Sequence, residues 1–287
     1  MLQITDAGSL SRMLGRGVSL LDHPIRTEMR EWILSQQTSS GGFADRGGEP
    51  DLYYSLFGFY LAGALEADMV LPMLKDYVKR EARQQHHQGI DLFCLAILHA
   101  SLFPDDPATD RYVVEIRKIS SDSLLQQNGY FPFLAILSLL YLRDHAGAWR
   151  ILRSIGNRRN GNDKPCPVVA AEQVLAFMKA GVAGEKPLMA FYRGNGGFAA
   201  LSNAPVPDLL STAVALFALQ FAGNDLRMVR PDCLRYVEEL YHEGGFRAGI
   251  RDEDVDVEYT FYGLLALGAL KSNSKIKDQK SKLEEKN

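Results

Sequence analysis

Residues 244–260 read GGFRAGIRDEDVDVEYT, and they contain a pattern that the chain repeats three times. Each copy has Gly-Gly-Phe, a short stretch, an Asp, a Ser or Thr four residues after that Asp, and then an apolar segment. The other copies are residues 196–212, GGFAALSNAPVPDLLST, and residues 41–55, GGFADRGGEPDLYYS. An internal repeat reflects a repeated structural unit, so the pattern predicts a fold assembled from such units.

Segments with helical spacing fill the rest of the chain, and they alternate between two kinds. Six are amphipathic with a charged face, at about residues 24–37, 67–83, 109–125, 145–156, 184–193 and 229–242. Six are apolar on nearly all sides, at about residues 51–65, 90–103, 129–142, 166–180, 208–222 and 256–270. A helix that is apolar all round is buried all round, whereas a charged stripe faces water. The alternation predicts an all-α fold, an α6/α6 toroid in which inner apolar helices lie inside outer amphipathic helices.

The residues of the repeated motif have a structural interpretation of their own. We expect the first glycine to end an outer helix in a left-handed conformation and the Phe to anchor the loop. Asp51, Asp208 and Asp256 stand where the N-terminus of an inner helix is expected. A carboxylate there accepts backbone N–H groups and complements the helix dipole, so each Asp is expected to be a helix cap.

Composition and charge exclude several classes of protein. The formal net charge of −3 over 287 residues argues against a nucleic-acid-binding protein. The three cysteines form no CxxC pair, which favours free thiols in a reducing compartment. No apolar run reaches the roughly 20 residues that span a bilayer, and the N-terminus lacks a signal peptide. We therefore expect a cytoplasmic protein with a lead-in over 1–23, one toroid domain over 24–270 and a polar, disordered tail over 271–287.

The repeat resembles the one shared by protein prenyltransferase β subunits and by squalene–hopene and related class II terpene cyclases. The resemblance covers roughly residues 25–270 and implies an α/α toroid that acts on isoprenoids. In the zinc-dependent prenyltransferases, an Asp and a Cys spaced DxC and a His from the last repeat hold the metal. Here Asp208 is present, but Leu210 takes the Cys place and Tyr259 the His place. Leu cannot ligate zinc, so the usual zinc ligands are not kept and we assign no metal-binding residues. Mg²⁺ or Zn²⁺ stays open as a cofactor.

The same resemblance points to acid chemistry at the third copy. Class II cyclases use a DxDD-T acid, and residues 256–260 (DVEYT) keep its first Asp and its Thr but not its second adjacent Asp. Crowded carboxylates raise one another's pKa, which keeps an acid protonated near neutral pH. The candidate catalytic residues are therefore Asp256, Glu258, Tyr259 and Asp208. The alternative is a solvated acidic loop followed by a helix cap.

Aromatic and basic residues near the starts of the inner helices are the candidates for substrate binding. An aromatic cavity suits an isoprenoid chain and stabilises a carbocation by cation–π contact; alternatively, the rings only pack between the helix layers. Three arginines in the repeat loops would hold a diphosphate, or would only neutralise nearby aspartates. The candidates are Tyr53, Tyr54, Phe57, Phe93, Tyr130, Phe217, Tyr262, Arg46, Arg247 and Arg251. His86, His87, Asp91 and Cys94 are metal-capable types without an ordering motif, and a helix cap and a buried thiol are the simpler explanation.

These observations support more than one function. The first hypothesis is an isoprenoid-related enzyme, prenyltransferase-like or class II terpene cyclase-like if active, that takes an isoprenoid small molecule or a prenyl diphosphate. The second is a non-catalytic toroid that binds a lipid or a protein partner. The third is a β-like subunit that requires a helical-repeat α partner, as the protein prenyltransferases do.

Overall fold

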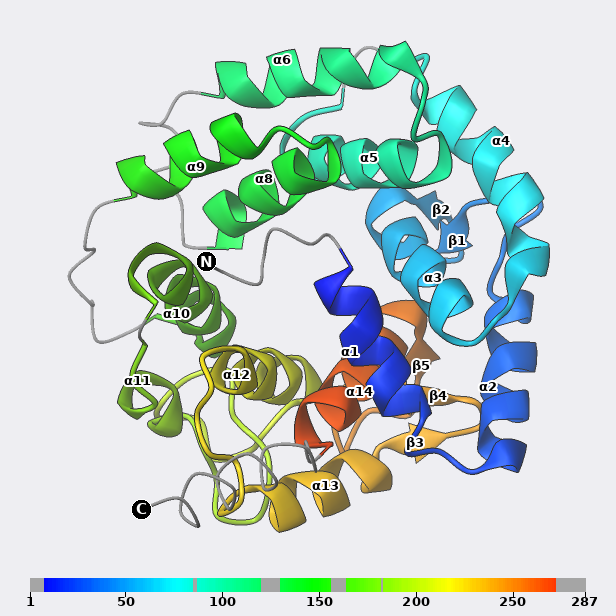
Figure 1. Ribbon diagram of the computed structural model, residues 1–287. Helices are drawn as coiled ribbons and strands as arrows, with labels where there is room; N and C mark the ends of the chain where they lie inside the picture. The colour runs from blue at the N-terminus through cyan, green and yellow to red at the C-terminus, as the bar shows by residue number, and fades with distance from the viewer. Residues whose placement is uncertain (1–7, 85–86, 120–129, 156–163, 182, 272–287) are drawn as a thin grey trace, which may run out of the picture.

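Six inner helices form a closed ring in the computed structural model, which describes residues 8–84, 87–119, 130–155, 164–181 and 183–271 (Figure 1). Each inner helix contacts the next one along the chain, and the last contacts the first. They are α3 (Leu52–Ala64), α5 (Gly89–Leu102), α8 (Tyr130–Tyr141), α10 (Cys166–Ala180), α12 (Leu209–Phe221) and α14 (Val257–Leu270). Because the ring closes, each apolar helix is buried between two like neighbours. The predicted α/α toroid is confirmed.

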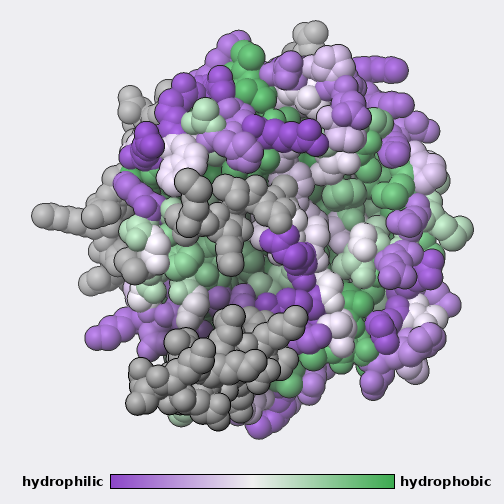
Figure 2. Space-filling view, viewed as in Figure 1, coloured by the Kyte–Doolittle hydropathy of each residue, from purple (hydrophilic) through white to green (hydrophobic). Residues whose placement is uncertain are grey.

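An outer helix lies against the ring at each repeat. These helices are α2 (His23–Ser35), α4 (Leu71–Glu81), α6 (Asp110–Lys118), α9 (His145–Ser154), α11 (Lys186–Met189) and α13 (Arg230–Glu239), with the 3₁₀ turns η1 (Asp68–Val70) before α4 and η2 (Pro107–Thr109) before α6. Figure 2 shows polar residues over much of the rim on this face, with apolar residues gathered nearer the middle. The expected helix over 184–193 shortens to α11, which carries Pro187 in its first turn and is followed by the next repeat loop.

Each copy of the motif folds as a small antiparallel pairing that leads into an inner helix. The pairings are β1 (Phe43–Ala44) with β2 (Pro50–Asp51), β3 (Tyr241–His242) with β4 (Gly245–Arg247) and β4 with β5 (Val255–Asp256), and a single bridge between Phe198 and Asp208. In every copy the Phe thus lies opposite the Asp. The Phe N–H donates to the Ser or Thr hydroxyl four residues after the Asp: Ser55 at 2.9 Å, Thr212 at 2.9 Å and Thr260 at 3.1 Å.

The three aspartates are N-caps, as the sequence predicts. The carboxylates of Asp51, Asp208 and Asp256 accept from the backbone N–H three residues later at 2.9, 2.7 and 2.7 Å. The expectation for the glycines was wrong, because α2 and α13 end at Ser35 and Glu239, well before Gly41 and Gly244. The first glycine of each pair lies instead in the following turn, with φ of +93°, +97° and +86° at Gly41, Gly196 and Gly244.

A helix that the sequence analysis did not identify, α1 (Ser9–Val18), lies within the expected lead-in. It contacts α14 and α3 and crosses the inside of the ring in Figure 1. Two glycines permit this approach, since a Cβ on Gly17 would overlap the Leu264 carbonyl and one on Gly268 would overlap the Met13 carbonyl. The expected tail, from residue 272 onward, lies outside the described residues. None of the described helices is long and apolar enough to cross a membrane.

Candidate functional site

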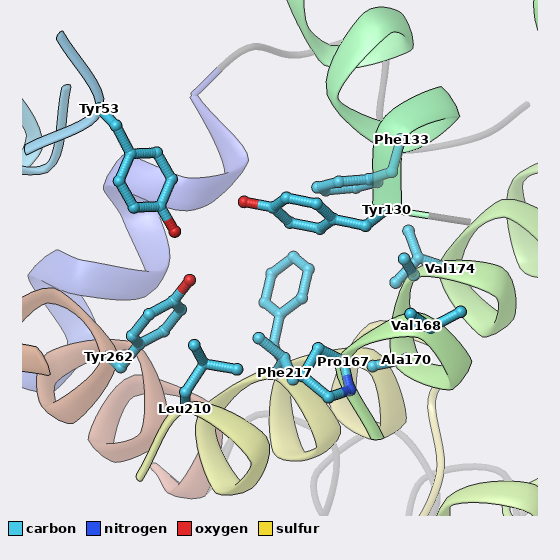
Figure 3. Close-up of a pocket in the computed structure, with 12 residues that line it drawn as sticks. Tyr53, Tyr130, Phe133, Pro167, Val168, Ala170, Val174, Leu210, Phe217 and Tyr262 are labelled. Atoms are coloured by element: carbon cyan, nitrogen blue, oxygen red, sulfur yellow. The ribbon is translucent and has the colours of Figure 1, made fainter. Parts of the chain in front are cut away.

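A cavity of about 280 Å³ lies among five of the inner helices (Figure 3). Its walls come mostly from α10 and α12, whose lining residues recur at the three- and four-residue spacing of one helix face. The described residues that line it are Tyr53, Tyr130, Phe133, Pro167, Val168, Ala170, Ala171, Val174, Leu210, Val214, Phe217 and Tyr262. None of these twelve is charged, and their only polar side-chain atoms are three tyrosine hydroxyls. The cavity is therefore an apolar space with one kind of polar group.

Four of the aromatic residues proposed from the sequence line this cavity, and three do not. Tyr53, Tyr130, Phe217 and Tyr262 contribute to the wall. Phe57 is instead buried between the rings of Tyr53 and Phe261, at centroid distances of 4.6 and 4.8 Å. Phe93 is fully buried 5.0 Å from Phe131, and the half-buried Tyr54 provides the N–H that Asp51 caps. Those three side chains therefore belong to the packing around the cavity.

The sequence analysis did not identify the α10 wall as part of the cavity. Pro167, Ala170, Ala171 and Val174 are spaced for one helix face, and that spacing was visible in the sequence. On a helix that is apolar all round, however, periodicity does not say which face meets a neighbour and which meets a cavity.

Three tyrosine hydroxyls converge at one end of the cavity (Figure 3). The hydroxyl of Tyr53 donates to Oε1 of Glu258 at 2.8 Å. The hydroxyls of Tyr130 and Tyr262 point towards the hydroxyl of Tyr53 (Figure 3). Burial raises the pKa of Tyr130 to about 12 and raises the pKa of Tyr53 and of Tyr262 well above the usual tyrosine value. All three are consequently neutral phenols at physiological pH.

Glu258 lies behind Tyr53, at the start of α14. Burial raises its pKa, and the negative charge of Asp256 adds to this, while the hydrogen bond from Tyr53 and the charge of Arg46 oppose it. A raised carboxyl pKa is the property that a proton donor needs. Glu258 reaches the cavity through Tyr53 and is not itself among the lining residues.

Asp256, by contrast, has both carboxylate oxygens engaged. Its Oδ1 caps α14 through the Tyr259 N–H at 2.7 Å, and its Oδ2 accepts from Nε of Arg46 at 2.6 Å. Arg46 also donates to Asp252 at 2.8 Å and lies 5.2 Å from the centre of the Tyr259 ring. Burial works against the charged forms of Arg46 and Asp252, but their hydrogen bonds outweigh it. The pKa of Arg46 is therefore raised, and the pKa of Asp252 is held below its usual value. Arg46 is thus committed to neutralising two aspartates, the alternative that the sequence analysis left open.

The remaining candidates lie around the same helix starts. Burial raises the pKa of Asp208, whose carboxylate caps α12. Burial, together with the charges of Glu258, Asp256 and Asp208, raises the pKa of Tyr259 to about 12. Asp208 lies at the start of α12, and the other three candidate catalytic residues lie at the start of α14, which contacts α12. Arg247 donates to the Glu239 carbonyl at 3.1 Å, and Arg251 is exposed. Neither arginine is a cavity residue.

The residues at the zinc positions of the resembling family do not fit a zinc ion. Leu210 is part of the apolar cavity wall, Tyr259 is a neutral phenol, and the Asp208 carboxylate is engaged as a helix cap. Within the described ranges, no three His, Cys, Asp or Glu side chains are grouped as metal ligands would be. Of the second cluster considered, His86 lies outside those ranges, His87 contacts the Glu81 carbonyl at 3.1 Å and Cys94 is a buried thiol whose pKa burial raises.

The chain belongs to the prenyltransferase α/α toroid family. A family model described as the prenyltransferase alpha-alpha toroid domain matches residues 8–87 and 170–285, which is more than half of the chain. The match includes all three copies of the motif, and the closed double ring of helices agrees with it. The family resemblance drawn from the sequence is confirmed. Comparison with curated proteins finds none that matches this chain.

Proposed function

We propose that this protein binds the hydrocarbon chain of an isoprenoid in the cavity among α3, α8, α10, α12 and α14. The observation that carries the proposal is the wall itself, twelve apolar or aromatic residues that surround about 280 Å³. Burial of apolar surface contributes about 25 cal/mol per Å², so a branched hydrocarbon gains affinity from every group it places there. The cavity volume is near the lower end of the range of about 300–1,000 Å³ that is usual for small-molecule binding pockets, and this favours a short prenyl chain.

The Glu258–Tyr53 pair supports acid–base chemistry on such a ligand as a second candidate function. Glu258 is a part-buried carboxyl with a raised pKa, and Tyr53 connects it to the cavity. A cyclase-like reaction that begins by protonation would use this connection. Zinc-dependent prenyl transfer has no comparable support, because Leu210 and Tyr259 do not fit the metal. Roles with a protein partner, including that of a β-like subunit, stay predictions.

Binding can be tested by filling the cavity. We expect farnesol, farnesyl methyl ether or both to raise the Tm of the protein and to bind with a dissociation constant measurable by calorimetry. Ala171→Phe places a ring in the cavity wall and should raise the dissociation constant at least about tenfold, which corresponds to a loss of roughly 1.4 kcal/mol of binding free energy. Ala176→Phe is the matched control, because it puts the same ring on an exposed position of the same helix.

The folding of the variants is checked separately. Helical circular dichroism shows whether Ala171→Phe retains the toroid, and the smaller Ala171→Val gives a second, milder filling of the same place. If no prenyl probe binds the parent protein, or if Ala171→Phe and Ala176→Phe bind equally well, the proposal is wrong.

A further inference from the structure

The loop between α11 and α12 carries exposed apolar side chains and no charge. Residues 199–207 read AALSNAPVP, and within them Leu201 is 42% exposed and Val206 is 49% exposed. Single exposed apolar residues are common at protein surfaces, so exposure by itself indicates nothing. The backbone of the same loop provides a second, independent observation.

Arg193, which lies just before the loop, binds the loop backbone. A guanidinium has five N–H donors, and all five of Arg193 are directed at backbone carbonyls. Three of these bonds are to the loop: Nε donates to Ala204 at 2.7 Å, and Nη2 donates to Leu201 at 3.1 Å and to Ser202 at 2.9 Å. The two bonds from Nη1 are to carbonyls within three residues before Arg193. The donors of this side chain are thus all used on peptide groups.

Other donors reach the rest of the loop. The Ala200 carbonyl accepts from the Cys166 N–H at 2.8 Å. The Pro207 carbonyl accepts from the Tyr236 hydroxyl at 3.0 Å. Together with the three bonds from Arg193, five carbonyls of this loop have donors within the protein. Carbonyls that are bonded internally lose no hydrogen bond when water is replaced by an apolar medium, which is the condition for backbone to enter lipid.

The loop lies at the end of the cavity wall. Pro167, in the first turn of α10, and Leu210, in the first turn of α12, both line the cavity (Figure 3). The loop before β5 lies alongside, because the Leu209 N–H donates to the Ala248 carbonyl at 2.8 Å. That second loop adds Ile250, which is 56% exposed. Exposed apolar residues of two loops therefore border the helix starts from which the cavity wall is built.

Charge selects the kind of lipid surface. Anionic lipids are bound by clusters of Lys and Arg. The first loop has no charged residue over 199–207, and residues 247–254 of the second loop hold two arginines against three carboxylates. One of those carboxylates, Asp252, is paired with Arg46. With no excess of positive charge, the two loops match a neutral, zwitterionic head-group layer.

We infer that the two loops form a lipid-contact surface, in which Leu201, Val206 and Ile250 enter the head-group region of a neutral bilayer beside the cavity. Few side chains take part, so the binding is weak and reversible. The cavity of the proposed function then lies next to a store of hydrocarbon. The inference goes beyond the proposed function and does not depend on it, because contact with lipid requires no molecule in the cavity.

A fluorescent label tests the contact at the loop directly. The three cysteines of the chain are buried, so an NBD fluorophore attaches to a cysteine introduced at the surface. On Leu201→Cys, we expect the emission to brighten and to shift to shorter wavelength when phosphatidylcholine vesicles are added, because the label leaves water. Val114→Cys is the matched control, since Val114 is 51% exposed on the outer helix α6 and its label should not respond.

Flotation with the same vesicles measures binding without a label. The double variant Leu201→Ser, Val206→Ser should have a partition coefficient at least about tenfold lower than the parent, because the apolar surface that enters lipid is removed. The double variant Val114→Ser, Met228→Ser is the control, since it removes exposed apolar surface elsewhere and should bind like the parent. Adding phosphatidylserine to the vesicles should change the partition coefficient by less than about twofold.

Three kinds of result would overturn the lipid assignment. The first is an unresponsive label on Leu201→Cys, or equal partition of the parent and the Leu201→Ser, Val206→Ser variant. The second is binding that requires phosphatidylserine and is lost in salt, which would place the contact on a basic surface elsewhere. The third is a dimer in sedimentation that the same double variant dissociates while vesicles leave the label unchanged. None of these results affects the proposed function, which the prenyl probes test separately.

Discussion

At the residue scale, Asp256 and Glu258 lie two positions apart at one helix start and have different roles. Asp256 caps α14 and pairs with Arg46, so both of its oxygens are occupied. Glu258 accepts from Tyr53 and has its pKa raised by burial. The sequence supplied both as candidate acids, and the contacts distinguish a structural carboxylate from one connected to the cavity. A catalytic role for Glu258 stays a prediction.

The raised pKa of Glu258 predicts how stability depends on pH. Because the folded protein holds this proton to higher pH than the unfolded chain does, ionisation of Glu258 costs stability as pH rises through the raised pKa. The charge of Asp256 also raises the pKa of this carboxyl, whereas Tyr53, Tyr54 and Arg46 lower it, and burial outweighs those three. Glu258→Gln removes the ionisation. We expect its Tm to exceed that of the parent by roughly 2 °C at pH 7–8 and to match it below about pH 4.

The measurement is a series of thermal unfolding curves across that pH range. Glu253→Gln is the control for the change in net charge, since Glu253 is exposed in the loop before β5 and should show no such difference. A Glu258→Gln protein that is less stable than the parent at pH 7–8 would show that the ionised carboxylate is a net stabilising acceptor.

At the scale of elements, the repeated unit extends further along the chain than its Gly-Gly-Phe start suggests. A Cβ on Gly58 of α3 would overlap the ring of Phe43, and one on Gly263 of α14 would overlap the ring of Phe246. Both glycines lie at the same position relative to the capping Asp of their copy. The second copy has Ala215 there, so its packing accommodates one methyl group. Each Phe therefore anchors its loop by lying against the helix backbone.

Two alanine substitutions on one helix test this packing. Gly58→Ala should lower the free energy of unfolding by about 1–3 kcal/mol, because the added methyl group meets the buried Phe43 ring. Gly63→Ala on the same helix has nothing within 4 Å of its new methyl group and is exposed, so it should gain up to about 1 kcal/mol from helix propensity. Urea denaturation of both variants measures the difference. Equal effects would mean that the Phe43 ring moves aside at no cost.

At the scale of the whole molecule, α1 is held against the ring by close backbone contact with α14. Gly17→Ala should lower the free energy of unfolding by about 1–3 kcal/mol, because the methyl group would meet the Leu264 carbonyl, a backbone atom that cannot rotate away. Gly15→Ala has open space on the same helix and should be neutral or slightly stabilising. Limited proteolysis should cut the first 22 residues faster in Gly17→Ala than in Gly15→Ala. Equal rates would contradict the close docking of α1.

Much of the fold could be predicted because periodicity and turn chemistry are local properties. The alternation of apolar and amphipathic segments indicates which helices are inner and which are outer, and Asp51, Asp208 and Asp256 indicate where inner helices begin. The short helix α11 shows a limit of this reasoning, since Pro187 and the following loop leave room for only four residues. The first glycine of each Gly-Gly-Phe shows a second limit. Glycine is favoured both in turns and at helix ends, so the residue type alone does not say which of the two it occupies.

The sequence alone was sufficient for the toroid, its helix caps and its family, since each depends on residues close together in the chain. Only the tertiary structure decided where α1 docks, which inner faces border the cavity, and that Tyr53, Tyr130, Tyr262 and Glu258 meet at one end. Those side chains come from three helices, and their convergence depends on how far the ring turns at each repeat. A helix that is apolar on every side carries no local mark of the face that meets a cavity.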